Sequence, residues 1–324
     1  MPLCLGIALA SGAPMASGLL GGIIGGIIIG AISGSSTSVS GPAAGLAAIV
    51  LASIVEIGSF DAFLIALILA GMLQIVLALI KAGGIASFFP NSVIKGLLTS
   101  IGIILVFKQI PHALGYDKDT EGDFYFSQAD HENTFSELLT GLHHLQLGAI
   151  ITTLICLFIL IFWTKIFPKK FSDLVPSSLV VVIVGILLNE LFSLHLPELF
   201  VESTHRVQLP QGLSLNSADK LFTMPQFSAI TNPLVWKAGI TLAIVASLET
   251  LLNVEATDKM DPTGRTTPTN RELVAQGIGN MCSGLLGGLP LTSVIVRSSV
   301  TVSYTHLRAH ETKANLVCRL LLEK

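Results

Sequence analysis

The sequence has 324 residues, of which 51% are hydrophobic and only 12% are charged, and its mean hydropathy is +0.76. Soluble domains carry about twice that charged fraction, roughly 25%. The composition therefore predicts a protein that crosses a membrane several times. The net charge of −3 is not typical of a protein that binds nucleic acid or a membrane surface through basic residues.

Apolar runs of helical length follow one another along the chain. They lie at about 18–32, 42–57, 60–80, 92–111, 145–167, 174–195, 233–255, 272–286 and 290–300. A shorter run opens the chain, and it predicts a half-helix or a true start further upstream because a spanning helix needs about 20 residues. The runs are unbroken and do not alternate, which favours about ten helical segments over barrel strands.

Charged residues predict the orientation of these segments. When the segments cross alternately, one side carries Lys81, Lys95, Lys165, Lys169, Lys170, Lys259, Arg265 and Arg271. The other side carries the acidic residues of the insert at 112–144, which are Asp117, Asp119, Glu121, Asp123, Asp130, Glu132 and Glu137. By the positive-inside rule the basic side is cytoplasmic, so we expect an inner (plasma) membrane protein. We interpret His143 and His144 as interfacial residues.

Cysteine spacing indicates neither disulfides nor a metal site. Cys4, Cys156, Cys282 and Cys318 are isolated from one another, and the first three lie among apolar residues. We interpret them as small core residues.

Two polar breaks interrupt the apolar pattern. The first is SGSSTSVSGPAAG at 33–45, and the second is GGLPLTSVIVRSS at 287–299. Non-helical backbone within a membrane is tolerated only where it faces protein or water. Pro42 suits the first position of a helix with Ser40 as its N-cap, and Thr292 with Ser293 would open another. Because helix N-termini attract anions, the two ends could form one anion site. The alternative is that the hydroxyl residues of the first break only cap a helix in an ordinary turn between helices.

Three side chains are candidates for chemistry inside the membrane, where ionisable groups are costly. Glu249 lies in an apolar run, and Asn253 follows it by one helical turn. This pair could hold Na⁺ or take up a proton, or it could make only a structural hydrogen bond. Arg297 in the second break could attract an anion, or its side chain could extend to the interface.

Four motifs resemble the sulfate permease (SulP) family of inorganic anion transporters. They are SVSGPAAGL from Ser38, SLETLLNVEATDKMD from Ser247, NRELVAQGIGN from Asn270 and GGLPLTSVIVRSS from Gly287. The resemblance covers about residues 1–299 and is strongest for bacterial members regarded as sulfate or bicarbonate carriers. It implies an all-α polytopic fold with two inverted repeats of seven segments, two discontinuous half-helices and a homodimer at full length.

The resemblance also implies site residues. The half-helices would begin at Ser38 to Gly41 and at Thr292 to Val294. The anion would meet Ser38, Val39, Ser40, Gly41, Thr292, Ser293, Val294 and Arg297. Glu249 and Asn253 match the acidic and cation-linked positions, so the implied coupling ion is Na⁺ or H⁺, with no other cofactor.

The chain departs from the family pattern at both ends. Leu3 follows Pro2 where many members have Gln or Glu. Residues 1–301 would form an incomplete transporter domain that lacks the last four segments and the STAS domain. Residues 302–324 lose the membrane pattern, and they resemble a translated sequencing-adapter artefact more than an amphipathic tail.

The resulting hypothesis is a secondary active transporter that carries sulfate or bicarbonate by alternating access. An anion channel, a nucleobase permease and a non-functional fragment are the alternatives. A membrane enzyme is disfavoured because the sequence contains no HExxH, GxSxG or Walker pattern.

Overall fold

The computed structural model describes residues 2–88, 90–116, 133–143, 145–166, 177–201 and 222–302. Its contacts divide the chain into two units, which we describe separately. Several predicted features lie outside the described residues. They are Asp117, Asp119, Glu121, Asp123, Asp130, Glu132, His144, Lys169, Lys170, Cys318 and nearly all of the tail at 302–324.

The first unit begins with short helices around the first break. Helix α1 (Pro2–Ala10) packs on α2 (Met15–Ile24), which continues through a π-helical turn (Gly25–Ile29) into α3 (Gly30–Ile32). After the break come strand β1 (Ser40–Pro42), a 3₁₀ turn (Ala44–Leu46) and α4 (Ala47–Ile57). Helix α1 has nine residues, and its Cys4 is buried as expected.

The rest of the first unit supplies the long helices. Helix α5 (Phe60–Leu79) is followed by a 3₁₀ segment (Ala82–Phe88). A 3₁₀ turn (Phe227–Thr231) then leads into α11 (Pro233–Met260), α12 (Thr269–Leu286) and strand β2 (Leu291–Ser293), and residues 295–302 are helical. Helix α11 starts where Asn232 accepts a hydrogen bond from the Leu234 amide at 2.9 Å, with Pro233 in the first helical position.

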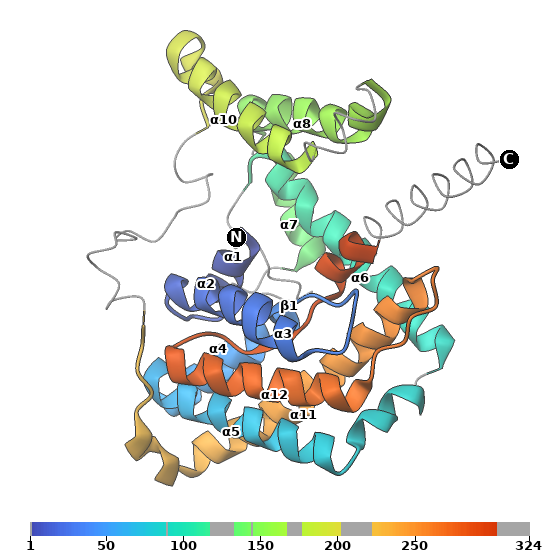
Figure 1. Cartoon of the computed structure of the whole chain (residues 1–324). Helices are drawn as coiled ribbons and strands as arrows, with labels where there is room; N and C mark the ends of the chain where they lie inside the picture. The colour runs from blue at the N-terminus through green and yellow to red at the C-terminus, as the bar shows by residue number, and fades with distance from the viewer. Residues whose placement is uncertain are drawn as a thin grey trace, which may run out of the picture. The chain divides into compact units, whose positions relative to one another are not determined.

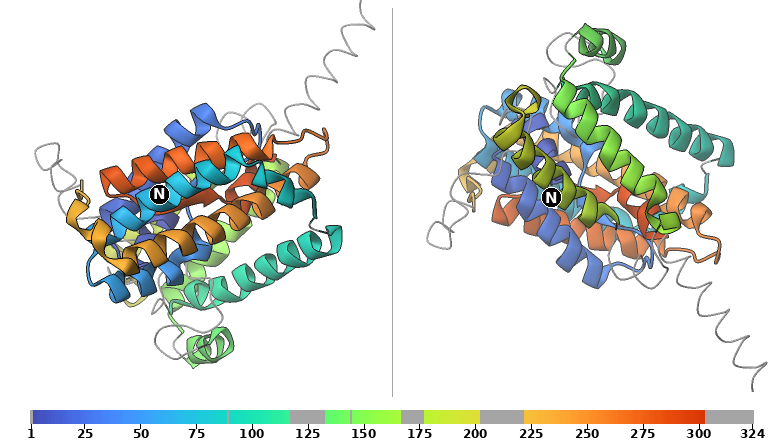
Figure 2. Two further views of the ribbon diagram at one scale, coloured as in Figure 1. Left: turned by 90° about the horizontal axis from the view of Figure 1, so that it is seen from below. Right: turned by 90° about the horizontal axis from the view of Figure 1, so that it is seen from above.

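Helix α5 forms the centre of this unit. It packs against both α11 and α12, and the three helices lie side by side in Figures 1 and 2. Glycines bring α5 and α12 into close contact, because a Cβ atom at Gly71 would lie 2.5 Å from the carbonyl oxygen of Gly277. Neither position therefore has room for a side chain, and the backbones pack directly.

The second unit is smaller. It contains most of α6 (Asn91–Leu114), then α7 (Thr134–His143), α8 (Leu147–Ile166), α10 (Ser177–His195) and a 3₁₀ turn (Pro197–Leu199). Helices α8 and α10 pack against each other, and Asn189 of α10 accepts a hydrogen bond from the Val201 amide at 3.0 Å.

Within the part of the chain that the structure describes, three helical stretches are long and apolar enough to cross a membrane, at Met15–Ile32, Phe60–Leu79 and Pro233–Met260. Helices α7 and α8 meet at 113° and would add a fourth as one bent span. The chain is thus a multi-pass, mostly helical membrane protein. The ten predicted segments also counted the opening run and shorter apolar runs, and the run at 290–300 is a strand followed by a helix.

Candidate anion-binding site

The two polar breaks meet backbone to backbone. Strands β1 and β2 pair antiparallel, with Ser40 opposite Ser293, Gly41 opposite Thr292 and Pro42 opposite Leu291. Further bonds extend the pairing at both ends, from the Ala43 amide to the Pro290 carbonyl at 3.1 Å and from the Val294 amide to the Val39 carbonyl at 2.9 Å. The sequence predicted that the breaks converge, and the structure brings them together as a strand pair.

The predicted start of the first helix is wrong. Pro42 belongs to β1, the 3₁₀ turn starts at Ala44, and neither this turn nor α4 has a side-chain cap. Ser40 is not an N-cap, because its hydroxyl accepts a hydrogen bond from Gln276 of α12. Gly41 also precedes a proline, a position that favours extended backbone over helix. The extended backbone of β1 instead pairs with β2.

The second helix begins close to its predicted position. Residues 295–302 are helical, and the first bond within this turn runs from the Ser298 amide to the Val294 carbonyl at 3.1 Å. The amides of residues 295–297 precede that bond, and such amides have no partner within their own helix. The amide of Val294, which is one of the predicted anion-site residues, donates to the Val39 carbonyl.

The strand pair also brings the N-termini of two helices close together. Each strand runs directly into a helix, β1 into residues 44–57 and β2 into residues 295–302. Because the strands are antiparallel, the two helices start at opposite ends of this short pair, so both N-termini lie beside the strand pair, which we call the crossing. Each helix N-terminus carries about half a positive charge, so the crossing concentrates positive potential.

Arg297 lies against the first break. A Cβ atom at Gly41 would be 2.7 Å from Arg297 Nη1, and Arg297 Nη2 donates to the Pro42 carbonyl at 3.4 Å. Arg297 Nε is buried and has no hydrogen-bond partner among the described residues. The guanidinium group therefore adds a full positive charge to the crossing, and its side chain does not extend away from the crossing toward an interface.

Glu249 approaches the crossing from α11. A Cβ atom at Gly45 would lie 2.9 Å from Glu249 Oε1, so the carboxylate contacts the turn that starts the first helix. It also lies near the hydroxyl of Thr292, which is buried and makes no hydrogen bond of normal geometry within the described residues. Gly41 and Thr292 are opposite residues of the strand pair and so share a face. Glu249 and Arg297 thus approach the same face.

The other predicted site residues hold the strands in place. Asn253 donates from Nδ2 to the Ser293 carbonyl at 2.6 Å, and the hydroxyl oxygens of Ser38 and Ser293 lie 2.6 Å apart. The Val39 amide donates to the Ser298 hydroxyl at 2.9 Å. Of the predicted set, Gly41, Thr292, Arg297 and Glu249 lie on the face described above, whereas Ser40 turns toward α12.

Sequence reasoning missed the polar residues of α12. Gln276 contacts Ser40, and Asn280 binds both the amide and the carbonyl of Leu291. The signal was present in NRELVAQGIGN, where Glu272, Gln276 and Asn280 recur at intervals of four residues and so lie on one helical face.

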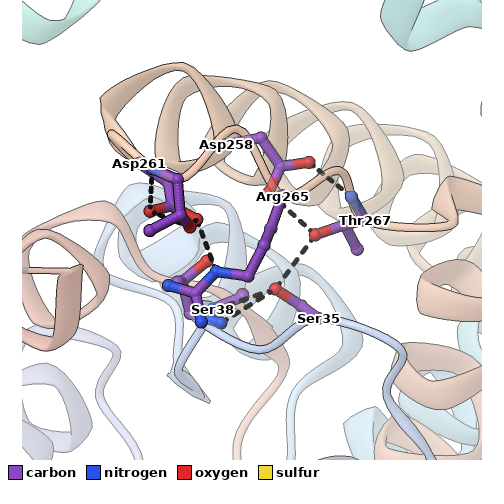
Figure 3. Close-up of polar contacts among 8 residues, drawn as sticks. Ser35, Ser38, Asp258, Asp261, Arg265 and Thr267 are labelled. Atoms are coloured by element: carbon purple, nitrogen blue, oxygen red, sulfur yellow. Dashed lines mark hydrogen bonds and ion pairs between the residues drawn. The ribbon is translucent and has the colours of Figure 1, made fainter. Parts of the chain in front are cut away.

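A second polar cluster fixes the start of the first break. Thr267, in the loop after α11, donates from its amide to Asp258 at 2.6 Å, and its hydroxyl oxygen lies 3.0 Å from that of Ser35 (Figure 3). Beside it, Arg265 donates to Asp261 at 2.6 Å, and this hydrogen bond holds the pKa of the Asp261 carboxyl well below its usual range. The cluster ties residues 33–38 to the end of α11.

Two broken membrane segments whose helix N-termini meet are the mark of a class of secondary transporters with discontinuous helices. The sequence matches the model of the sulfate permease family over residues 1–305, so the chain belongs to this family. It is a membrane transporter family, and the chain is not an enzyme.

Individual relatives agree with this assignment. The chain is 30% identical over 241 residues to the putative sulfate transporter YvdB of Bacillus subtilis, covering 74% of this chain and 41% of that protein. It is 28% identical over 221 residues to the bicarbonate transporter BicA of Picosynechococcus, covering 68% of this chain and 35% of that protein. The chain thus spans about two fifths of these relatives or less.

Solved structures share the fold. The transmembrane domain of a cyanobacterial bicarbonate transporter BicA superposes with a TM-score of 0.61 at 25% identity, covering 94% of this chain and 73% of that one. SLC26A9 superposes with a TM-score of 0.58 at 16% identity, covering 93% of this chain and 48% of that one, which shows the fold alone.

Proposed function

We propose that this chain contains the anion-binding part of a secondary active transporter for a small inorganic anion of the sulfate or bicarbonate type. The observation that carries the proposal is the strand pair itself, which aims two helix N-termini at one crossing and places Arg297 against it. An oxyanion suits this arrangement because backbone amides and a guanidinium group are donors without acceptor character. The positive charge of Arg297 favours an anion over a neutral nucleobase.

Glu249 could couple anion binding to the binding of Na⁺ or a proton. Its carboxylate lies at the start of the first helix, where a negative charge opposes the entry of an anion. A Na⁺ ion or a proton at Glu249 would neutralise that charge and so favour anion binding. Asn253 would support the cation through Oδ1, because its Nδ2 already donates to the Ser293 carbonyl. We therefore assign Glu249 and Asn253 as the coupling pair.

The proposal extends to the whole protein. Residues 1–301 form the transporter domain in the plasma membrane, where it works by alternating access and dimerises at full length. We place the end of that domain near residue 302, the last residue of the helix at 295–302. Sequencing the locus from independent reads across codon 302 tests this boundary, and a read that continues in the same frame into the same tail would contradict it.

The test of the function is uptake into proteoliposomes that contain the full-length protein, because this chain is proposed to contain its anion-binding part. We expect saturable uptake of labelled sulfate or bicarbonate, and counterflow when the same anion is preloaded inside. Uptake that does not saturate and shows no counterflow would favour the channel, and uptake of uracil without either anion would favour the permease. Failure of sulfate and bicarbonate to bind the purified chain would refute the anion site itself.

A further inference from the structure

One face of α12 carries a row of buried polar side chains. Glu272, Gln276, Asn280 and Ser283 follow one another at intervals of four, four and three residues, and their side chains are at most 1% exposed. That spacing places all four on one side of the helix. Buried polar groups need partners, and here the partners are the two breaks.

Gln276 holds the first break. The NH₂ group of its side chain has two hydrogens, and it donates to Glu272 Oε1 at 3.0 Å and to Ser40 Oγ at 2.7 Å. Glu272 also accepts a hydrogen bond from the Ser33 hydroxyl. The carboxylate thus fixes which way the Gln276 amide points, and α12 holds the first break at its first residue, Ser33, and at the start of β1, Ser40.

Asn280 holds the second break. Its Oδ1 accepts from the Leu291 amide at 2.7 Å, and its Nδ2 donates to the Leu291 carbonyl at 3.0 Å and to Gln74 at 2.8 Å. Ser283 donates to the Leu289 carbonyl at 2.6 Å, which fixes the approach to β2. Adjacent turns of one rigid helix therefore contact β1 and β2.

We propose that Gln276 and Asn280 are positioning residues. Because they lie on adjacent turns of α12, they fix the position of β1 relative to β2 and hence the distance between the two helix N-termini. Glu272 acts through Gln276 by orienting its amide. This inference rests on the proposed anion site, which these residues serve without contacting the anion. Gln276 bonds the hydroxyl of Ser40, on the face opposite the one that Glu249 and Arg297 approach, and Asn280 bonds the main chain of Leu291.

The variant Gln276→Met tests the proposal, because it keeps a similar volume and removes both donors. Asn270→Ala is the matched control, since it removes one hydrogen bond from the same helix, that of the Gly83 amide to Asn270 at 2.9 Å, without touching either break. Two measurements apply to the purified chain in nanodiscs. They are amide hydrogen exchange in a peptide covering residues 36–43, and the Kd for sulfate and for bicarbonate.

We expect Gln276→Met to exchange roughly tenfold faster over residues 36–43 and to bind the anion roughly tenfold more weakly, a change of about 1.4 kcal/mol. The control should match wild type in both measurements. Unchanged exchange over 36–43 in the variant would overturn the positioning role. If Gln276→Met fails to fold, Gln276→Asn, which is one methylene shorter and still polar, should show the same two changes.

Different results would refute the proposed function and the positioning role of Gln276. If the wild-type chain binds neither anion, the proposed function fails, yet hydrogen exchange still decides whether Gln276 positions the first break. If the wild type binds the anion and Gln276→Met alters hydrogen exchange but not Kd, α12 positions the backbone of the first break, and the claim that this positioning sets anion affinity is refuted.

Discussion

Replacing Gly41 with alanine is the sharpest test of the role of Arg297. The new Cβ atom would lie 2.7 Å from Arg297 Nη1, so the guanidinium must retreat by about 0.7 Å to reach ordinary contact. The bond from Nη2 to the Pro42 carbonyl is already 3.4 Å long and would be lost. Displacing a charged donor from an anion costs about 1.5–3 kcal/mol, so we expect the Kd for the anion to rise by about tenfold or more.

Isothermal titration calorimetry of the purified chain measures this Kd directly. The matched control is Gly26→Ala on α2's π-helical continuation, because a Cβ atom there meets nothing within 4 Å. The control should bind as wild type does. If Gly41→Ala folds with the wild-type Tm and binds the anion with unchanged affinity, the guanidinium does not contribute to the site and the reasoning above is wrong.

Three further predictions follow from other parts of the structure. Glu249→Gln should abolish the dependence of anion uptake on Na⁺ or pH while leaving the Tm nearly unchanged, and retained coupling would contradict its role. Gly277→Ala should destabilise the chain by about 1–3 kcal/mol in thermal unfolding, because its Cβ would lie 2.7 Å from the Gly71 carbonyl, whereas Gly84→Ala, with nothing within 4 Å, should be neutral. The lowered pKa of Asp261 stabilises the fold above its unfolded-state pKa of about 3.9. The Tm advantage of wild type over Asp261→Asn should therefore be full at neutral pH and shrink as the pH falls below about 4, and a constant difference would argue against the pairing.

Much of the architecture could be predicted from local pattern. The apolar runs located the helices, and the polar breaks at 33–45 and 287–299 were recognised because hydroxyl and glycine residues stand where hydrocarbon is expected. The second helix begins one residue after the predicted Val294. Residues close together in the sequence determine these features, so composition and periodicity are enough to predict them.

The errors came from long-range pairing. Ser40 and Pro42 carry the local signals of a helix start, but β2 supplies hydrogen bonds that favour an extended backbone. Asn253 was paired with Glu249 by helical spacing, and its amide also reaches the Ser293 carbonyl from the second break. The positions of Gln276 and Asn280 depend on where a distant break passes, which no local pattern encodes.

The pairing of the two breaks has a consequence for biosynthesis. Ser38 and Ser293, whose hydroxyls meet at the crossing, are 255 residues apart in the sequence. At about 5–20 residues per second, a ribosome needs roughly 10–50 s to make the intervening chain. During that interval the first break has entered the membrane without the strand that satisfies its backbone, a costly state in hydrocarbon. The nascent chain must therefore keep residues 33–45 near water, the translocon or a chaperone until β2 emerges.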